Sequence, residues 1–135
     1  MVYPMFAMIL LTFSVAIYML KLRIHAVKRG ELKLSYFRLN SGDEASTKLL
    51  QASRNYSNLF EMPVLFYAAG TIAIALHLEG LTIMTLSWTF VATRVVHSWI
   101  HLTNNNVIHR LKAFMLGNIC VLLIWGQVVW EYTKH

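Results

Sequence analysis

The chain alternates between long apolar stretches and short polar segments. Its first stretch, residues 1–20, contains no charged residue, and about 20 apolar residues are enough to cross a bilayer as a helix. Three further apolar stretches follow at intervals that suit the same role. The pattern therefore predicts an all-α integral membrane protein with a bundle of four transmembrane helices. The expected helices occupy residues 3–28, 46–78, 81–103 and 107–132 of a single domain that spans 1–135.

Turn-forming residues separate these stretches. Gly30 favours an end to the first helix, and residues 40–43 are typical of a turn within the polar connector 31–45. A short polar turn at 77–80 and the Asn104–Asn106 segment divide the later helices.

Composition supports a membrane location. The chain is 57% hydrophobic and only 13% charged, whereas soluble domains are about one quarter charged. A cleaved signal peptide is not expected, because basic residues follow the first apolar stretch and no small-residue cleavage site comes after it. The single cysteine, Cys120, gives no disulfide framework and is expected to be a packing residue in an apolar helix.

The lysines and arginines predict an orientation. The connector after the first helix and the turn after the third are basic, whereas the 77–80 turn has no lysine or arginine. The positive-inside rule then puts both basic loops in the cytoplasm and both termini outside. This topology and anionic lipid headgroups account for the net charge of +6, so no nucleic-acid partner is expected. The compact length and the lack of a retention signal favour a bacterial inner membrane.

A polar stripe interrupts the second helix. Arg54, Asn58 and Glu61 are spaced i, i+4 and i+7, which places them on one face of a helix. Charged groups near hydrocarbon cost on the order of a few kcal/mol, so these side chains should face the bundle interior or a polar cavity. An interhelical ion pair and a polar ligand pocket are both open interpretations. Pro63 is expected to kink the helix beside Glu61.

A second stripe lies in the third helix. Arg94, His97 and His101 are spaced i, i+3 and i+7 at the same expected membrane depth, and Arg110 lies at the start of the fourth helix. The two stripes should therefore form one polar site near the cytoplasmic interface. Its arginines outnumber its glutamate, so it should prefer a ligand with more carboxylates than amines. Arg94 could contact that ligand or pair with Glu61, since both satisfy the same electrostatics.

A metal or haem site is the competing interpretation of the histidines. His97 and His101 are four residues apart, and His109 is close in sequence. No HExxH pattern or CxxC pair accompanies them, and the nearby arginines would repel a cation. We expect no metal, and interior histidines that bond a ligand or a neighbouring helix.

The two stripes resemble motifs of a known family. The first, with a proline shortly after its glutamate, looks like the second-helix signature of the membrane-associated proteins in eicosanoid and glutathione metabolism, the MAPEG family. The second stripe and the arginine after it are similar to the microsomal glutathione transferase branch, in its bacterial form. The resemblance covers nearly the whole chain. The matching positions are Arg54, Asn58, Glu61, Pro63, Arg94, His97, His101 and Arg110.

Three positions depart from the family pattern. Pro63 stands two residues after Glu61, where relatives usually have it three residues after. His101 stands where many relatives have a tyrosine, and Tyr56 where some have glutamine. The fold expectation survives these changes, whereas the catalytic expectation is weakened by them.

The resemblance implies a ligand, a mechanism and an assembly. Glutathione would be the cofactor, and Arg110 the catalytic residue, since a nearby cation lowers a thiol pKa from about 8.5 toward neutrality. The implied function is a glutathione transferase or peroxidase for hydrophobic small molecules that arrive through the lipid bilayer, in a homotrimer. The alternative is a non-catalytic family member that binds a lipid or a partner protein. The implied glutathione-binding residues are Arg54, Asn58, Glu61, Arg94, His97 and His101.

Overall fold

The computed structural model describes residues 1–39 and 45–134, and the turn predicted at 40–43 lies outside them. Within the described residues all regular structure is helical, which confirms the all-α fold class. The helices are α1 (Val2–Lys28), α2 (Tyr36–Leu39), α3 (Thr47–Asn58), α4 (Met62–Ala75), α5 (Leu81–Leu102) and α6 (Val107–Tyr132).

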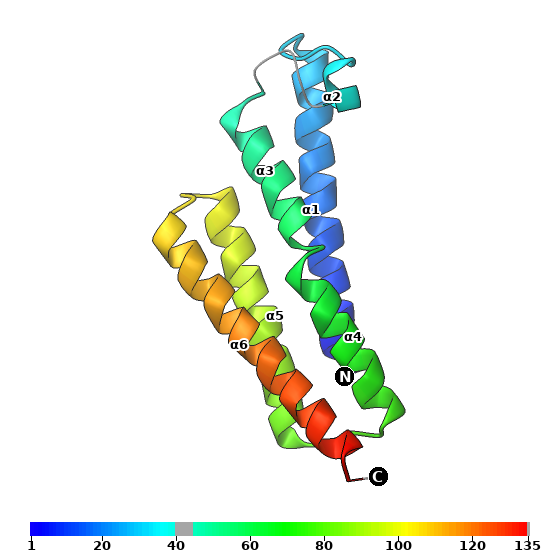
Figure 1. The fold of residues 1–135 in the computed structure, drawn as a ribbon. Helices are drawn as coiled ribbons and strands as arrows, with labels where there is room; N and C mark the ends of the chain where they lie inside the picture. Colours follow the sequence, from blue (N-terminus) through cyan, green and yellow to red (C-terminus); the bar gives the residue numbers. More distant parts are fainter. Residues whose placement is uncertain (40–44, 135) are drawn as a thin grey trace.

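The long helices form an elongated bundle. α1 packs along α3, α5 packs along α6, and α4 continues the course of α3 to reach α6 (Figure 1). The N- and C-termini lie toward the same end of the bundle (Figure 1). This arrangement fits an even number of passes through a membrane.

Three segments in the described ranges are long and apolar enough to cross a membrane, namely Val2–Lys28, Thr47–Ala75 and Val107–Tyr132. Large apolar side chains such as Phe6 and Phe13 of α1 point outward, as expected of a lipid-facing helix. α5 has 22 residues, and its length of about 33 Å would also suffice, but buried polar residues lower its hydropathy. A fourth crossing by α5 therefore stays a prediction.

The second expected helix, 46–78, is not continuous, and this corrects the prediction of a single kinked helix. α3 ends at Asn58, α4 begins at Met62, and residues 59–61 form a turn that we call the helix break. Pro63 lies in the first turn of α4, where its missing N–H costs no helical hydrogen bond. The chain therefore accommodates the proline by ending one helix and starting another.

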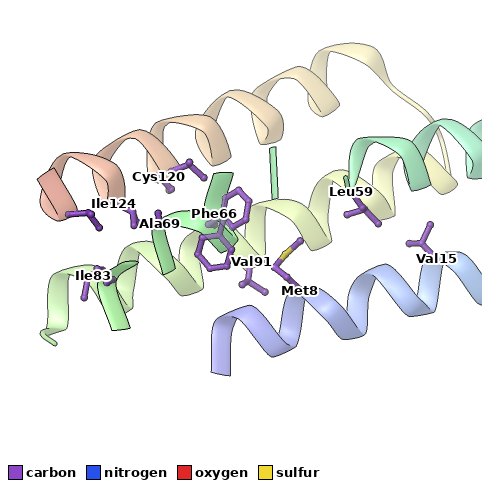
Figure 2. Packing of buried hydrophobic residues seen from close by; sticks show 13 residues of the cluster. Met8, Val15, Leu59, Phe66, Ala69, Ile83, Val91, Cys120 and Ile124 are labelled. Atoms are coloured by element: carbon purple, nitrogen blue, oxygen red, sulfur yellow. The ribbon is translucent and has the colours of Figure 1, made fainter. Parts of the chain in front are cut away.

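One hydrophobic cluster joins the long helices (Figure 2). The rings of Phe66 and Phe90 lie 4.5 Å apart between centroids and connect α4 to α5. Gly117 of α6 faces α5 so closely that a Cβ atom there would lie 2.9 Å from Thr93 Oγ1. The position of α6 relative to α5 is thus tightly constrained. The labelled members are Met8, Val15, Leu59, Phe66, Ala69, Ile83, Val91, Cys120 and Ile124.

Gly117→Ala is expected to destabilise the protein by about 1–3 kcal/mol, because the added methyl group would push two closely packed helices apart. Unfolding in mixed detergent and denaturant measures this change. Gly126→Ala is the matched control on the same helix, because a Cβ atom there meets nothing within 4 Å in the described structure. The control should be neutral or stabilising by up to about 1 kcal/mol. Equal stability of the two variants would contradict the close α5–α6 packing.

Candidate functional site

Arg94 closes the helix break from the side of α5. In a continuous helix the Asn58 carbonyl would accept a hydrogen bond from the Met62 N–H, but α4 starts afresh at Met62. Arg94 Nη2 instead donates to the Asn58 carbonyl oxygen at 2.9 Å. Arg94 is only 1% exposed, and its guanidinium lies 5.8 Å from the ring centroid of Phe114. A buried side chain of α5 thus caps the end of α3.

The interaction of Arg94 with Glu61 is at longer range. In the described part of the chain no ion pair within 4.0 Å involves Glu61, and its carboxylate makes no capping hydrogen bond at the start of α4. Glu61 is exposed. Of the two roles that the sequence left open for Arg94, a close pair with Glu61 is not formed in the described structure, where Arg94 bonds the backbone instead. The Glu61 carboxylate stays available to a ligand.

The asparagine turn after α5 positions Arg110. Asn106 begins α6, and its Oδ1 accepts hydrogen bonds from two backbone N–H groups of the first turn at 3.0 and 3.1 Å. Asn105 has a φ of 53°, in the left-handed region that asparagine tolerates better than most residues. Its Oδ1 accepts a hydrogen bond of 2.6 Å from Arg110 Nη1. The turn therefore fixes one edge of the guanidinium and leaves Arg110 Nε buried without a partner in the described structure.

His97 is oriented by the backbone of α6. Its Nδ1 lies 3.1 Å from the Arg110 carbonyl oxygen, and since a carbonyl can only accept, the Nδ1 atom carries the hydrogen. The other nitrogen, Nε2, is then an acceptor, and it is buried without a partner in the described structure. His97 Nε2 therefore offers one free lone pair beside α6, the helix that carries Arg110.

Glu61, His97 and Arg110 line one cavity of about 250 Å³ between the helix break, α5 and α6. It combines a carboxylate, an amide, an imidazole and a guanidinium over an aromatic wall. The volume lies just below the ~300–1,000 Å³ typical of small-molecule sites, so one protomer encloses only part of a sizeable ligand. The lining residues are Asn58, Glu61, His97, Val107, Arg110, Leu111 and Phe114.

The structure does not bring all predicted site residues to this cavity. Arg54 is exposed and lines a neighbouring pocket with Arg23 of α1. His101 is 1% exposed, and neither ring nitrogen has a hydrogen-bond partner in the described structure. The i, i+4, i+7 spacing predicts that Arg54, Asn58 and Glu61 form one stripe on a helix. Because α3 ends at Asn58 and α4 starts at Met62, Glu61 does not continue a regular helical stripe with Arg54.

The sequence analysis does not identify two asparagines, one that bonds Arg110 and one that is buried in α3. The sequence indicates only that Asn105 belongs to a helix-breaking segment, and no periodic spacing links it to Arg110. Asn55 of α3 is fully buried, and both its amide atoms lack a partner in the described structure. Its spacing from Leu49 and Ala52, on the buried face of an amphipathic helix, was a signal that could have identified it.

In the described ranges no group of three or more His, Cys, Asp or Glu residues is placed to hold a metal ion. The single cysteine, Cys120, is buried in α6 with a free thiol.

A family model described as the MAPEG family matches residues 1–130. A search of curated proteins found no match to the chain.

Arg94→Leu is expected to speed amide exchange across residues 56–64 by about tenfold or more, because the Asn58 carbonyl loses its donor and the helix break opens more easily. Hydrogen–deuterium exchange with mass spectrometry, without added ligand, measures this. Glu61→Gln is the discriminating variant and should leave the exchange unchanged, since Glu61 forms no close pair with Arg94. A Glu61→Gln effect as large as that of Arg94→Leu would show an ion pair to be the main restraint.

Proposed function

The chain belongs to the MAPEG family, and from this premise we propose that it is a membrane-embedded glutathione transferase or peroxidase acting on apolar electrophiles. The family includes glutathione-dependent enzymes and non-catalytic members, so membership alone does not give the activity. The observation that carries the proposal is the cavity in which Asn58, Glu61, His97 and Arg110 come together.

The cavity and the pocket that contains Arg54 together offer one carboxylate for the ammonium of glutathione and two arginines for its negative groups. Glutathione has two carboxylates and one ammonium, and Glu61 offers a carboxylate that is unpaired in the described structure. In the proposed complex Glu61 binds the ammonium, Asn58 bonds a peptide group, and His97 Nε2 accepts a hydrogen bond from the ligand. Arg54 takes a carboxylate from the adjoining pocket. Arg94 acts by holding the helix break. His101 does not line the cavity, and its ring centroid lies 5.9 Å from that of His97.

Arg110 supplies the chemistry in this proposal. Its Nε has no partner in the described structure, and its Nη1 is held by Asn105 of the asparagine turn. A fixed cation beside the sulfur lowers the thiol pKa from about 8.5, and the thiolate is the reactive nucleophile. The thiol proton leaves to water. In the transferase reaction the thiolate forms a bond to the electrophilic carbon while the leaving group departs with the electron pair of the broken bond. In the peroxidase reaction it attacks a peroxide oxygen and breaks the O–O bond, which gives glutathione sulfenic acid and an alkoxide that takes a proton to become an alcohol. The thiol of a second glutathione then attacks the sulfenic acid sulfur, forms the disulfide and releases water.

A homotrimer would complete the site. The cavity in one protomer is small for a tripeptide, and the pocket that contains Arg54 is separate from it. A neighbouring protomer could close the open side of both, and the family resemblance points to three copies. We further propose that both termini lie outside the cytoplasm, on the distribution of basic residues, and that the membrane is a bacterial inner membrane, on the compact length and the lack of a retention signal.

The second candidate function is non-catalytic binding of a lipid or a partner protein. It is favoured by His101, which stands where many relatives have a tyrosine and has no hydrogen-bond partner in the described structure. In that case the polar residues around the helix break would serve the fold alone.

Arg110→Ala is expected to abolish the thiolate of bound glutathione at neutral pH and to lower turnover of an electrophile by about 10²-fold, because the stabilising cation is lost. Ultraviolet difference titration with glutathione detects the thiolate. Lys112→Ala is the control, since it removes a cation of the same helix that does not line the cavity. Thiolate that persists in Arg110→Ala contradicts the assigned role, and binding without thiolate in the unmodified protein favours the non-catalytic function.

Asn105→Gly tests whether the asparagine turn orients Arg110. Glycine keeps the left-handed backbone of the turn but removes the acceptor of the 2.6 Å bond. We expect unchanged stability within about 1 kcal/mol and a partial loss of thiolate, with the thiol pKa between those of the unmodified protein and Arg110→Ala. A thiolate titration identical to that of the unmodified protein would show that Arg110 is positioned without Asn105.

A further inference from the structure

Arg23 of α1 and Arg54 of α3 line one pocket, and the proposed function uses only Arg54 of the two. The pocket has a volume of about 220 Å³ and lies between α1 and α3, with α2 at its mouth. Arg23 Nη2 donates to Ser53 Oγ at 3.4 Å, and its guanidinium lies 5.4 Å from the ring centroid of Phe37. In the described structure neither Arg23 nor Arg54 has a carboxylate within 4.0 Å. The pocket therefore contains two positive charges, and in the described structure neither has a carboxylate counterion.

An apolar groove lies further along the same pair of helices and shares no lining residue with this pocket. Its volume is about 470 Å³, and it lies between α1 and the α3–α4 segment. Its α1 residues Ile9, Phe13 and Ala16 lie about four, three and two helical turns before Arg23. The other lining residues are Thr12, Tyr56, Leu59, Phe60, Val64 and Tyr67.

The dimensions of pocket and groove match one leaflet of a bilayer. Ile9 and Arg23 are fourteen positions apart on α1, which corresponds to about 21 Å. One leaflet has about 15 Å of hydrocarbon and about 5–7 Å of headgroup. Residues 1–20 carry no charge and span about 30 Å, so Arg23 lies one turn beyond the hydrocarbon, at the depth of lipid phosphates.

We propose that this seam binds one anionic phospholipid, with its phosphate between Arg23 and Arg54 and an acyl chain in the groove. Arginine guanidinium groups suit phosphate oxygens, and the Ser53 hydroxyl adds a further polar group at the same place. Charge complementarity selects an anionic headgroup, and the groove selects a molecule with a long apolar tail. The site goes beyond the proposed function and shares only Arg54 with it. Glutathione could supply an anion to the same pocket, but it has no chain to fill the groove.

The test measures retention of phosphatidylglycerol and phosphatidylcholine by native mass spectrometry of the detergent-purified protein. Arg23→Gln is expected to weaken phosphatidylglycerol retention about tenfold, since one of two arginine contacts is lost. Lys21→Gln removes the same charge from an exposed position on the same helix and should have little effect. Ala16→Phe fills the groove without changing charge and should also reduce retention. Each variant is first shown to elute and unfold like the unmodified protein.

Three results would overturn the proposal. Equal losses in Arg23→Gln and Lys21→Gln would show attraction to surface charge alone, and equal retention of both lipids would show that the headgroup is not recognised. Competition between glutathione and the lipid is expected, because both use Arg54, but glutathione binding that Arg23→Gln weakens as much as it weakens lipid retention would assign the whole pocket to glutathione. Lipid retention as expected in a protein that binds no glutathione would instead leave this inference standing and contradict the proposed function.

Discussion

The hydrogen bond from Arg94 to the Asn58 carbonyl is the interaction on which the rest of the site depends. Pro63 prevents a regular helix through residues 59–61, and a backbone carbonyl in apolar surroundings needs a donor. Arg94 supplies this donor from 36 residues further along the chain. The bond ties the α3–α4 segment to α5, and the close contact at Gly117 ties α5 to α6. These two contacts fix the position of the helix break relative to Arg110.

Some polar groups of the interior bond the chain itself, and others have no partner. Arg94 Nη2 donates to the Asn58 carbonyl, and Asn105 Oδ1 accepts from Arg110 Nη1. In the described structure His97 Nε2, Arg110 Nε, and Arg94 Nε and Nη1 are buried without a partner, and each such group costs about 1–3 kcal/mol. Glu61, His97 and Arg110 line one cavity, and the proposed function puts a polar ligand there that would bond them.

Much of the fold could be predicted from the sequence because the bilayer sets the length of each helix. The first, third and fourth expected helices differ from α1, α5 and α6 by no more than one residue at either end. The second could not be predicted as well. A proline indicates a weak point, but whether the helix bends or stops depends on a donor such as Arg94, which no local pattern reveals. The stripe spacing of Arg54, Asn58 and Glu61 failed for the same reason, since it assumed one uninterrupted helix. The link between Asn105 and Arg110 arises from turn geometry and leaves no periodic trace.

The most direct test of this account is a cryo-electron microscopy reconstruction of the protein in lipid nanodiscs with saturating glutathione. The account predicts density for glutathione at the helix break, with its ammonium at Glu61 and its sulfur beside Arg110, while Arg94 still donates to the Asn58 carbonyl. Glutathione bound elsewhere, or an Arg94 side chain that turns to the ligand while α3 and α4 join into one helix, would contradict it.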